Sequence, residues 1–367
     1  VDDLPSYRAA MEWALEADPS TALGLASRLG QILDTRGSIV EGRLWVERAL
    51  AVGHDAPPGE LVQALAAAGT LSRIQGDLPA SRGHHERQLQ VAKEIGDEKL
   101  VAGSLSALGN VLLLQGEARA ATEAFRTSYD MRVEQGDEVG IMRSLNNLGV
   151  LAGMAGDHEE AERCYVELID RARTTGDSRV IGQTLHNLAD LLATANRLDE
   201  ATAHIDEALG HLEVVGDRRS LGISHGLRAA LARRAGQFDD ALRFGLVAID
   251  YLAGVGDPVG VALVVDGVAA TLTEQNRSDL DEAALQLLAA TALLRGGEAE
   301  RGLTEADCGE LARDALKRRL GAAAYERAAS QAGSAVDLEA LLEQAAAAAK
   351  AGRAGAESGQ AGAESAG

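Results

Sequence analysis

Histidines, cysteines and paired carboxylates are the side chains of this sequence that could hold a metal ion or act as acids, bases and nucleophiles. The eight histidines are scattered along the chain. His204 and His211 share a helix face but lie seven positions apart, too far for one metal ion without ligands from elsewhere. Cys164 and Cys308 have no neighbouring cysteine at ligand spacing. These residues therefore predict no metal site and no catalytic nucleophile.

Phosphate-binding and zinc-protease motifs are also missing from the sequence. No Gly-Lys-Ser or Gly-Lys-Thr follows a glycine-rich loop, and no His-Glu-x-x-His occurs. Carboxylate pairs such as Glu159-Glu160 stand at expected helix N-termini, where the helix dipole favours negative charge. The sequence thus predicts a protein without a catalytic centre, a metal or a cofactor.

Residues that end helices recur with a constant spacing. The pair Gly-Asp returns every 40 residues, beginning at Gly96, Gly136, Gly176, Gly216 and Gly256. A second series, half a unit away, has Gly or Asn at 76, 116, 156, 196, 236 and 276. Gly and Asn adopt the left-handed conformation that ends a helix, and Asp is a good N-cap for the next helix. The two series predict two helices of about 17 residues, each roughly 25 Å long, per unit.

Small and bulky apolar residues keep the same phase. Alanines one unit apart mark positions where a larger side chain would push neighbouring helices apart: Ala121, Ala161, Ala201 and Ala241. Between the helix-ending residues, apolar residues follow the helical i, i+3, i+4, i+7 spacing. One such set is Leu105, Leu108, Gly109 and Leu112.

This order of a small residue, a loop glycine, a second small residue and a bulky residue four positions later resembles the tetratricopeptide repeat. The unit of 40 residues is longer than the usual repeat. It is similar to the variety found in kinesin light chains and in bacterial regulators of the MalT type. The resemblance implies an all-α fold, an α-solenoid of about seven tetratricopeptide-like helix pairs with a C-terminal helical cap.

The start of the chain extends this resemblance. The stretches "YRAAMEWALEAD" and "EGRLWVERALA" are similar to the beginning of the repeat region in large bacterial signal-transduction ATPases and transcription regulators, the MalT-like, LuxR-type and SARP-type predicted ATPases. In that family the repeats form the C-terminal part and a nucleotide-binding domain precedes them. The chain opens with Val1, so we expect a segment of a longer protein. The two tryptophans, Trp13 and Trp45, are expected to pack in the core.

The expected organisation has four parts. A leading helix occupies 1–18, the repeat array 19–295, capping helices 296–350 and a disordered tail 351–367. An open solenoid end needs a cap with a polar outer face. The tail "AGRAGAESGQAGAESAG" has no apolar periodicity that could form a core.

The first helix of each pair lines the concave groove of an α-solenoid. By analogy with the repeat family, groove positions lie three and six residues before the small residue of that helix, and one, four and five residues after it. In the third to fifth units these are Gly103, Ser106, Asn110, Leu113, Leu114, Arg143, Asn146, Val150, Gly153, Met154, Gln183, His186, Asp190, Ala193 and Thr194.

The stretch "LNNLGVL" resembles the asparagine-rich first helix of kinesin light chains. In such repeats the amides can pair with the backbone of a bound peptide, because an amide both donates and accepts hydrogen bonds. We therefore expect a protein or peptide ligand in the groove; the alternative is that these residues are ordinary solvated ones. The candidate residues are Ser106, Asn110, Arg143, Asn146, Asn147, Gln183, His186, Asn187 and Asp190.

Charge excludes some partners. The net charge of −21 opposes binding to phosphate backbones and to anionic membrane surfaces. Neither a signal peptide nor an apolar run long enough to span a membrane is present in the sequence. We therefore predict a cytoplasmic protein that binds neither nucleic acid directly nor a membrane.

Two functions agree with these features. The first is a non-catalytic sensor arm of a bacterial signal-transduction ATPase or transcription regulator, with an ATPase or DNA-binding domain of the same polypeptide as a partner. It would bind a protein, a peptide or an inducer. The alternative is a free-standing scaffold or adaptor for protein–protein interaction. An enzyme is least favoured, because the sequence clusters no nucleophile, base and metal ligand.

Overall fold

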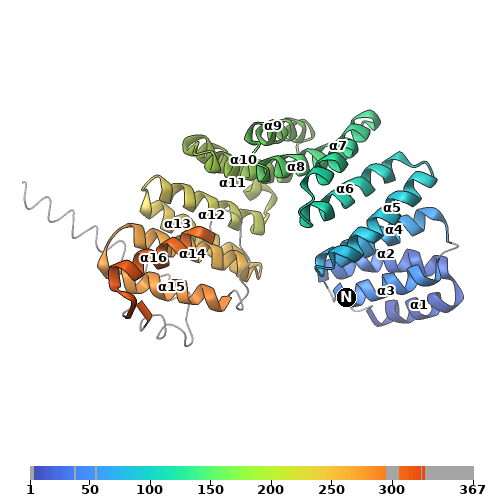
Figure 1. Ribbon diagram of the computed structural model, residues 1–367, viewed down its shortest axis with the longest axis horizontal. Helices are drawn as coiled ribbons and strands as arrows, with labels where there is room; N and C mark the ends of the chain where they lie inside the picture. Colours follow the sequence, from blue (N-terminus) through green and yellow to red (C-terminus); the bar gives the residue numbers. More distant parts are fainter. Residues whose placement is uncertain (1–3, 37–38, 54–55, 295–305, 324, 327–367) are drawn as a thin grey trace, which may run out of the picture. The chain divides into compact units, whose positions relative to one another are not determined.

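The computed structural model describes residues 4–36, 39–53, 56–294, 306–323 and 325–326. Every regular element within these residues is a helix, and no strand occurs among them. The chain divides into two compact units, Val1–Arg171 and Ala172–Gly367, with the boundary inside α9 (Figure 1).

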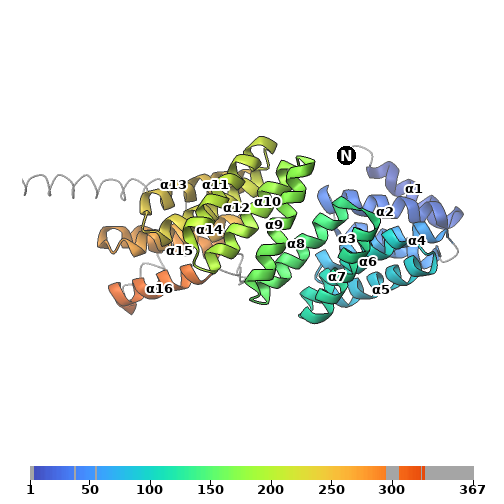
Figure 2. The ribbon, with the colours of Figure 1, turned by 90° about the horizontal axis from the view of Figure 1, so that it is seen from above.

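Antiparallel helix pairs make up both units. In the first unit, α1 (Leu4–Ala17) precedes the pairs α2 (Pro19–Arg36) with α3 (Ile39–Val52), α4 (Pro58–Ile74) with α5 (Leu78–Glu94), α6 (Glu98–Leu114) with α7 (Ala118–Gln135), and α8 (Glu138–Met154) with α9 (His158–Thr175). The second unit contains α10 (Ser178–Thr194) with α11 (Leu198–Val215), α12 (Arg218–Arg234) with α13 (Phe238–Gly254), α14 (Pro258–Glu274) with α15 (Asp281–Leu294), the short 3₁₀ helix η1 (Ser278–Leu280), and α16 (Ala306–Leu320). Figures 1 and 2 both show α12 and α13 side by side. The predicted all-α repeat of helix pairs is confirmed.

The helix ends use the residues that the sequence predicts. Gly136 has a φ of 65°, and Asn196 and Asn276 have φ values of 60° and 55°. These are left-handed conformations, which asparagine adopts more readily than other residues with a Cβ. The Oδ1 atom of Asp97 accepts a hydrogen bond from the backbone nitrogen of Leu100 at 3.0 Å. The same capping bond recurs at Asp77, Asp137, Asp157, Asp177, Asp217 and Asp257.

Small residues allow the two helices of a pair to touch. A Cβ added to Gly109 would lie 2.7 Å from Cε1 of Phe125, and one added to Gly149 would lie 2.6 Å from Cε1 of Tyr165. Both rings are buried, so each aromatic ring lies directly on the backbone of the facing helix. The alanines predicted at close contacts are buried as well: Ala121, Ala161, Ala201 and Ala241.

The two tryptophans differ in their burial. Trp45 is 7% exposed and lies in a core cluster with Met11 and Ala14 of α1, so the prediction for Trp45 is confirmed. Trp13 is 62% exposed, and the prediction that it packs in the core is wrong. Residues advance about 100° around a helix, so Trp13 is turned about 200° from Met11 and about 100° from Ala14, the two residues that α1 buries.

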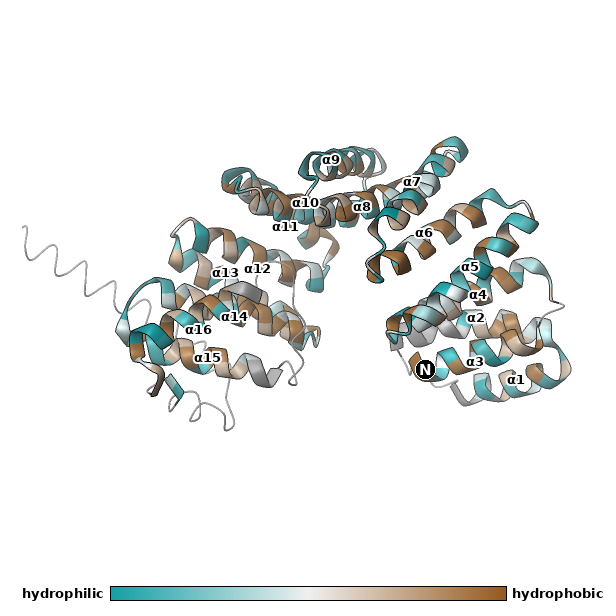
Figure 3. Ribbon diagram, in the orientation of Figure 1, coloured by the Kyte–Doolittle hydropathy of each residue, from teal (hydrophilic) through white to brown (hydrophobic). Residues whose placement is uncertain are grey.

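In the C-terminal part of the second unit that the structure describes, α16 packs against α14 and α15. Cys308, Ala312 and Leu316 lie four residues apart on one face of α16 and join the core cluster of α14 and α15. Figure 3 shows apolar residues, in brown, along α14, which α15 and α16 contact. The guanidinium of Arg319 donates to Oδ1 of Asn276 at 2.9 Å. The rest of the expected capping segment and the expected tail, 351–367, lie outside the described residues.

Candidate ligand-binding pocket

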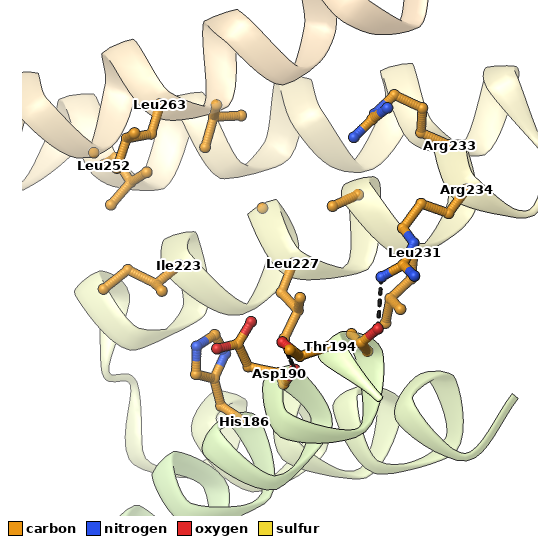
Figure 4. A pocket seen from close by; sticks show the side chains of 15 residues that line it. His186, Asp190, Thr194, Ile223, Leu227, Leu231, Arg233, Arg234, Leu252 and Leu263 are labelled. Atoms are coloured by element: carbon orange, nitrogen blue, oxygen red, sulfur yellow. Dashed lines mark hydrogen bonds between the residues drawn. The ribbon is translucent and has the colours of Figure 1, made fainter. Parts of the chain in front are cut away.

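A pocket of about 450 Å³ lies between α10, α12 and α14 in the second unit (Figure 4). These three helices are the first helices of successive pairs. Figure 4 shows the side chains of His186 and Asp190 pointing from α10 toward α12. The lining residues are His186, Asp190, Ala193 and Thr194 of α10, Ile223, Gly226, Leu227, Ala230, Leu231, Arg233 and Arg234 of α12, Leu252 of α13, and Gly260, Leu263 and Val264 of α14.

The register of the repeat explains this cavity. Residues 40 positions apart occupy equivalent places in successive units, so Gly226 and Ala230 of α12 stand where α10 carries His186 and Asp190. Gly226 packs closely against α14, because a Cβ added there would lie 3.1 Å from Cγ2 of Val264. Ala230 carries only a methyl group, so the α12 wall of the cavity lacks a large side chain at this position. Ile223 is equivalent to a glutamine of α10. The result is a cavity with largely apolar walls and polar groups on the α10 side.

His186 enters the pocket as a neutral base. Its half-buried imidazole has Nδ1 at 3.1 Å from Oγ of Ser224. Burial lowers the pKa of His186 to about 4, because loss of water disfavours the charged imidazolium. At pH 7 this ring therefore carries no charge and offers one donor and one acceptor nitrogen.

Asp190 lies one turn after His186 on the same helix face. Burial raises the pKa of its carboxyl group, since desolvation also disfavours a carboxylate. The hydroxyl of Thr194 donates to the backbone oxygen of Asp190 at 3.0 Å. Within the described part of the chain, however, no group donates to the carboxylate of Asp190 or pairs with it.

The two arginines of the pocket are held by other groups. Nη1 of Arg233 donates to Oε1 of Glu274 at 2.5 Å. Nη1 of Arg234 donates to the backbone oxygen of Ala193 at 2.7 Å, and its Nη2 donates to Oδ1 of Asn196 at 3.0 Å. Arg233 is therefore neutralised by a carboxylate, whereas Arg234 holds the C-terminal end of α10.

Residues 222–226 have the Gly-x-Ser-x-Gly spacing with which many hydrolases present a nucleophile. That nucleophile stands on an exposed turn, whereas Ser224 lies in the middle of α12 and is 1% exposed. Equivalent positions in earlier units hold Ser104 and Thr184, and each donates to the backbone oxygen four residues earlier at 2.7 Å. Ser224 thus occupies a repeated packing position, and its buried hydroxyl is out of reach of a substrate.

The pocket lining includes predicted groove positions of the fifth unit and the equivalent positions of the sixth unit, which were not among the predicted ones. In the fifth unit, His186, Asp190, Ala193 and Thr194 line it. In the sixth unit, all of the equivalent positions do: Ile223, Gly226, Ala230, Arg233 and Arg234. Moving the predicted positions forward by 40 residues would have identified them.

The other predicted residues of the second unit lie outside this lining. Nε2 of Gln183 donates to Oγ of Ser220 at 3.2 Å. Asn187 is half-buried on α10. Of the four candidate polar residues on α10, the structure therefore brings His186 and Asp190 together in the pocket.

The predicted residues of the first unit lie on α6 and α8. Oγ of Ser106 is 2.9 Å from Oγ of Ser128, so this hydroxyl lies between the two helices of a pair. The remaining residues are surface or half-buried: Asn110, Arg143, Asn146 and Asn147. Exposed apolar residues also recur at the C-terminal ends of α4, α6 and α8: Ile74, Leu114 and Met154. Binding by any of these residues stays a prediction.

The described residues bear on two further kinds of site, a reactive thiol and a metal site. Burial raises the pKa of the Cys164 thiol to about 11, so it is protonated at pH 7 and a poor nucleophile. Among the described residues, no three His, Cys, Asp or Glu side chains are grouped as metal ligands. None of the described helices is long and apolar enough to cross a membrane.

Comparison with known proteins agrees with the helix pairs. The family model described as Tetratricopeptide repeat matches residues 141–175. No curated protein sequence matches this chain significantly.

Several solved structures share the fold over most of the chain. The Rap protein complexed with Competence and Sporulation Factor is 12% identical, with 90% of this chain and 99% of that chain covered and a TM-score of 0.52. Aspartyl phosphate phosphatase F from Bacillus subtilis is 12% identical, with coverages of 89% and 92% and a TM-score of 0.58. A Signal Transduction ATPase with Numerous Domains from Pyrococcus horikoshii, which has a tetratricopeptide repeat sensor, is 14% identical, with coverages of 90% and 52% and a TM-score of 0.57. The helix pairs, the family match and these neighbours together show that this chain has a tetratricopeptide-type α-helical repeat fold.

Proposed function

We propose that this chain is a non-catalytic binding region and that the pocket between α10, α12 and α14 is its ligand site. The observation that carries the proposal is the coincidence of the pocket with the repeat positions that line the groove in this type of fold. Its volume of about 450 Å³ falls in the usual range for ligand sites, roughly 300–1,000 Å³. Apolar walls with a few polar groups are also typical of such sites. The ligand would be a protein segment, a peptide or a small inducer.

The role we propose for this binding is that of a sensor arm in a bacterial signal-transduction ATPase or transcription regulator in the cytoplasm. Two neighbours in fold support it: one has a tetratricopeptide repeat sensor, and one is complexed with Competence and Sporulation Factor. The chain spans about half of the Pyrococcus horikoshii protein, 52%. An ATPase or DNA-binding domain in the same polypeptide is part of this proposal.

A free-standing scaffold is the second candidate. It is favoured by the exposed apolar residues of the first unit, such as Leu114 and Met154, which a protein partner could cover. A scaffold would form complexes that are indifferent to nucleotide and to small molecules, whereas a sensor arm would release or gain its partner when either is added. Pull-downs from the native host with and without ATP would separate the two roles.

The pocket itself is tested by filling it. Ala230→Phe would add a ring to the α12 wall of the cavity. The ligand for this test is a peptide selected from a display library against the full chain. We expect it to bind the variant at least about tenfold more weakly than the wild type, because the ring would block its contact with the α12 wall; a tenfold change corresponds to roughly 1.4 kcal/mol of binding free energy. Isothermal titration calorimetry measures the affinity, and circular dichroism checks that the helices remain folded.

Val214→Phe is the matched control. Val214 is 80% exposed on α11, so the same ring added there should leave the affinity unchanged. Equal binding by Ala230→Phe and the wild type would place the ligand elsewhere and contradict the proposal.

A further inference from the structure

We infer that the pocket takes a ligand with an ammonium group on an apolar chain, and that the ammonium group binds at Asp190. This inference rests on the proposed function of the pocket and specifies the chemistry of its ligand. Two observations support it: the other charged side chains of the pocket already have partners within the protein, and apolar side chains lie beside Asp190.

Four titratable side chains line the pocket, and three of them are already satisfied or uncharged. Arg233 is paired with Glu274. Arg234 donates to the end of α10. His186 contacts Ser224, and burial, by lowering its pKa, leaves it neutral at pH 7. Asp190 differs from these three, because no described group donates to its carboxylate.

A carboxylate without donors in a partly desolvated site is unfavourable. A ligand ammonium group would supply both a positive charge and three N–H donors. Charge-assisted hydrogen bonds of this kind are about twice as strong as those between neutral groups. A ligand carboxylate would instead be repelled by Asp190, and Arg234 would have to leave its two acceptors to reach it. The pocket therefore favours a cation over an anion.

The rest of the site is suited to a hydrocarbon chain. Ile223 and Leu227 of α12 and Leu263 of α14 line the cavity, and Figure 4 shows Ile223 and Leu227 on the side nearer to the α10 side chains. Ile223 is exposed, so covering it removes apolar surface from water and favours binding. The small side chain of Ala230 leaves room for the chain. A linear or branched apolar group attached to the ammonium would fill this space.

Two sources share this chemistry: small alkyl amines and the free amino terminus of an apolar peptide. Calorimetric titrations of the full chain at pH 7 with hexylammonium, hexanol and hexanoate test the charge preference. We expect hexylammonium to bind at least about tenfold more tightly than hexanol and hexanoate to bind most weakly. Leucyl-leucinamide with a free amino terminus, compared with its N-acetyl form, tests the peptide source. Tighter binding of the free dipeptide than of hexylammonium identifies a peptide terminus, and the reverse order identifies a small amine.

Asp190→Asn keeps the shape of the side chain and removes its charge. In this variant the preference for hexylammonium over hexanol should disappear, while hexanol should bind as in the wild type. Asp250→Asn is the matched control, because it removes one exposed carboxylate of α13 away from the pocket. The control should keep the full preference.

The outcomes separate this inference from the proposed function. If hexylammonium and hexanol bind equally, and Ala230→Phe abolishes both, the pocket is a binding site but the inference is wrong. Tighter binding of hexanoate than of hexylammonium also overturns the inference. If no probe binds the wild type, the inference fails, whereas the proposed pocket is still decided by the experiment with the selected peptide and Ala230→Phe.

Discussion

His186 and Asp190 illustrate what burial does to single residues in the pocket. Desolvation lowers the pKa of the imidazole and raises the pKa of the carboxyl group, so both are shifted toward their neutral forms. The two shifts have opposite consequences for stability. The folded protein binds fewer protons than the unfolded chain at His186, and more at Asp190.

The shift at His186 predicts a loss of stability in mild acid. As pH falls from about 6.5 toward 4, the unfolded imidazole takes up a proton that the folded protein does not, so the free energy of unfolding decreases. Between pH 7 and pH 5, the free energy of unfolding of His186→Gln should fall by about 1 kcal/mol less than that of the wild type. This value is smaller than the pKa shift alone would give, because water in the pocket screens the half-buried ring. Urea unfolding of both proteins at pH 7 and pH 5 measures the difference.

Other histidines do not obscure this comparison. Burial also lowers the pKa of His84, His85 and His225, but these residues are present in both proteins. The difference between the pH dependences of the two unfolding free energies therefore measures the contribution of His186. Identical pH dependences would show that the ring titrates normally in the folded protein.

At the scale of the helix pair, the contact between Gly109 and Phe125 sets how closely α6 and α7 pack. Gly109→Ala would place a methyl carbon 2.7 Å from the buried ring, so the ring or the helix must move. We expect the free energy of unfolding to fall by about 1–3 kcal/mol, the usual result of overpacking a core. Chemical denaturation measures it, and Phe125→Leu in the same chain should restore part of the loss.

Gly103→Ala provides a control on the same helix. No atom lies within 4 Å of a Cβ at Gly103, so alanine should be neutral or stabilise the helix by up to about 1 kcal/mol. If both substitutions had the same effect, helix propensity rather than packing would explain the result at Gly109.

The helix pairs were predictable from the sequence because their signals are local. A left-handed φ at Gly136 or Asn196 and a cap at Asp97 depend on a few neighbouring atoms, and the recurrence of these residues gives the period. The orientation of Trp13 depends on which face of α1 is covered, which is a tertiary property. The pocket depends on how α10, α12 and α14 are spaced around a small residue such as Ala230, and the sequence indicates the small residue without indicating which neighbours leave the space empty.

At the scale of the whole molecule, substantial contacts join only helices that are neighbours or next neighbours in the described sequence. The free energy of unfolding of such a chain is approximately the sum of the stabilities of the single repeats and of the interfaces between neighbouring repeats. Ile205→Ala, at a fully buried position of α11, should increase amide hydrogen exchange in α10, α11 and α12 and leave α4, α5 and α6 unchanged. Exchange detected by mass spectrometry tests this, and a uniform increase along the chain would indicate cooperative unfolding of both units.

Arg234 connects ligand chemistry to the geometry of a helix junction. Its guanidinium lines the cavity and also donates to Ala193 and to Asn196, the residue whose left-handed backbone turns the chain from α10 into α11. A molecule that drew this guanidinium away would weaken the anchoring of that turn. Thermodynamic linkage makes such an effect mutual: a second binding event that loosened the junction would change the affinity for that molecule by the same factor by which the molecule changes the affinity of the second event.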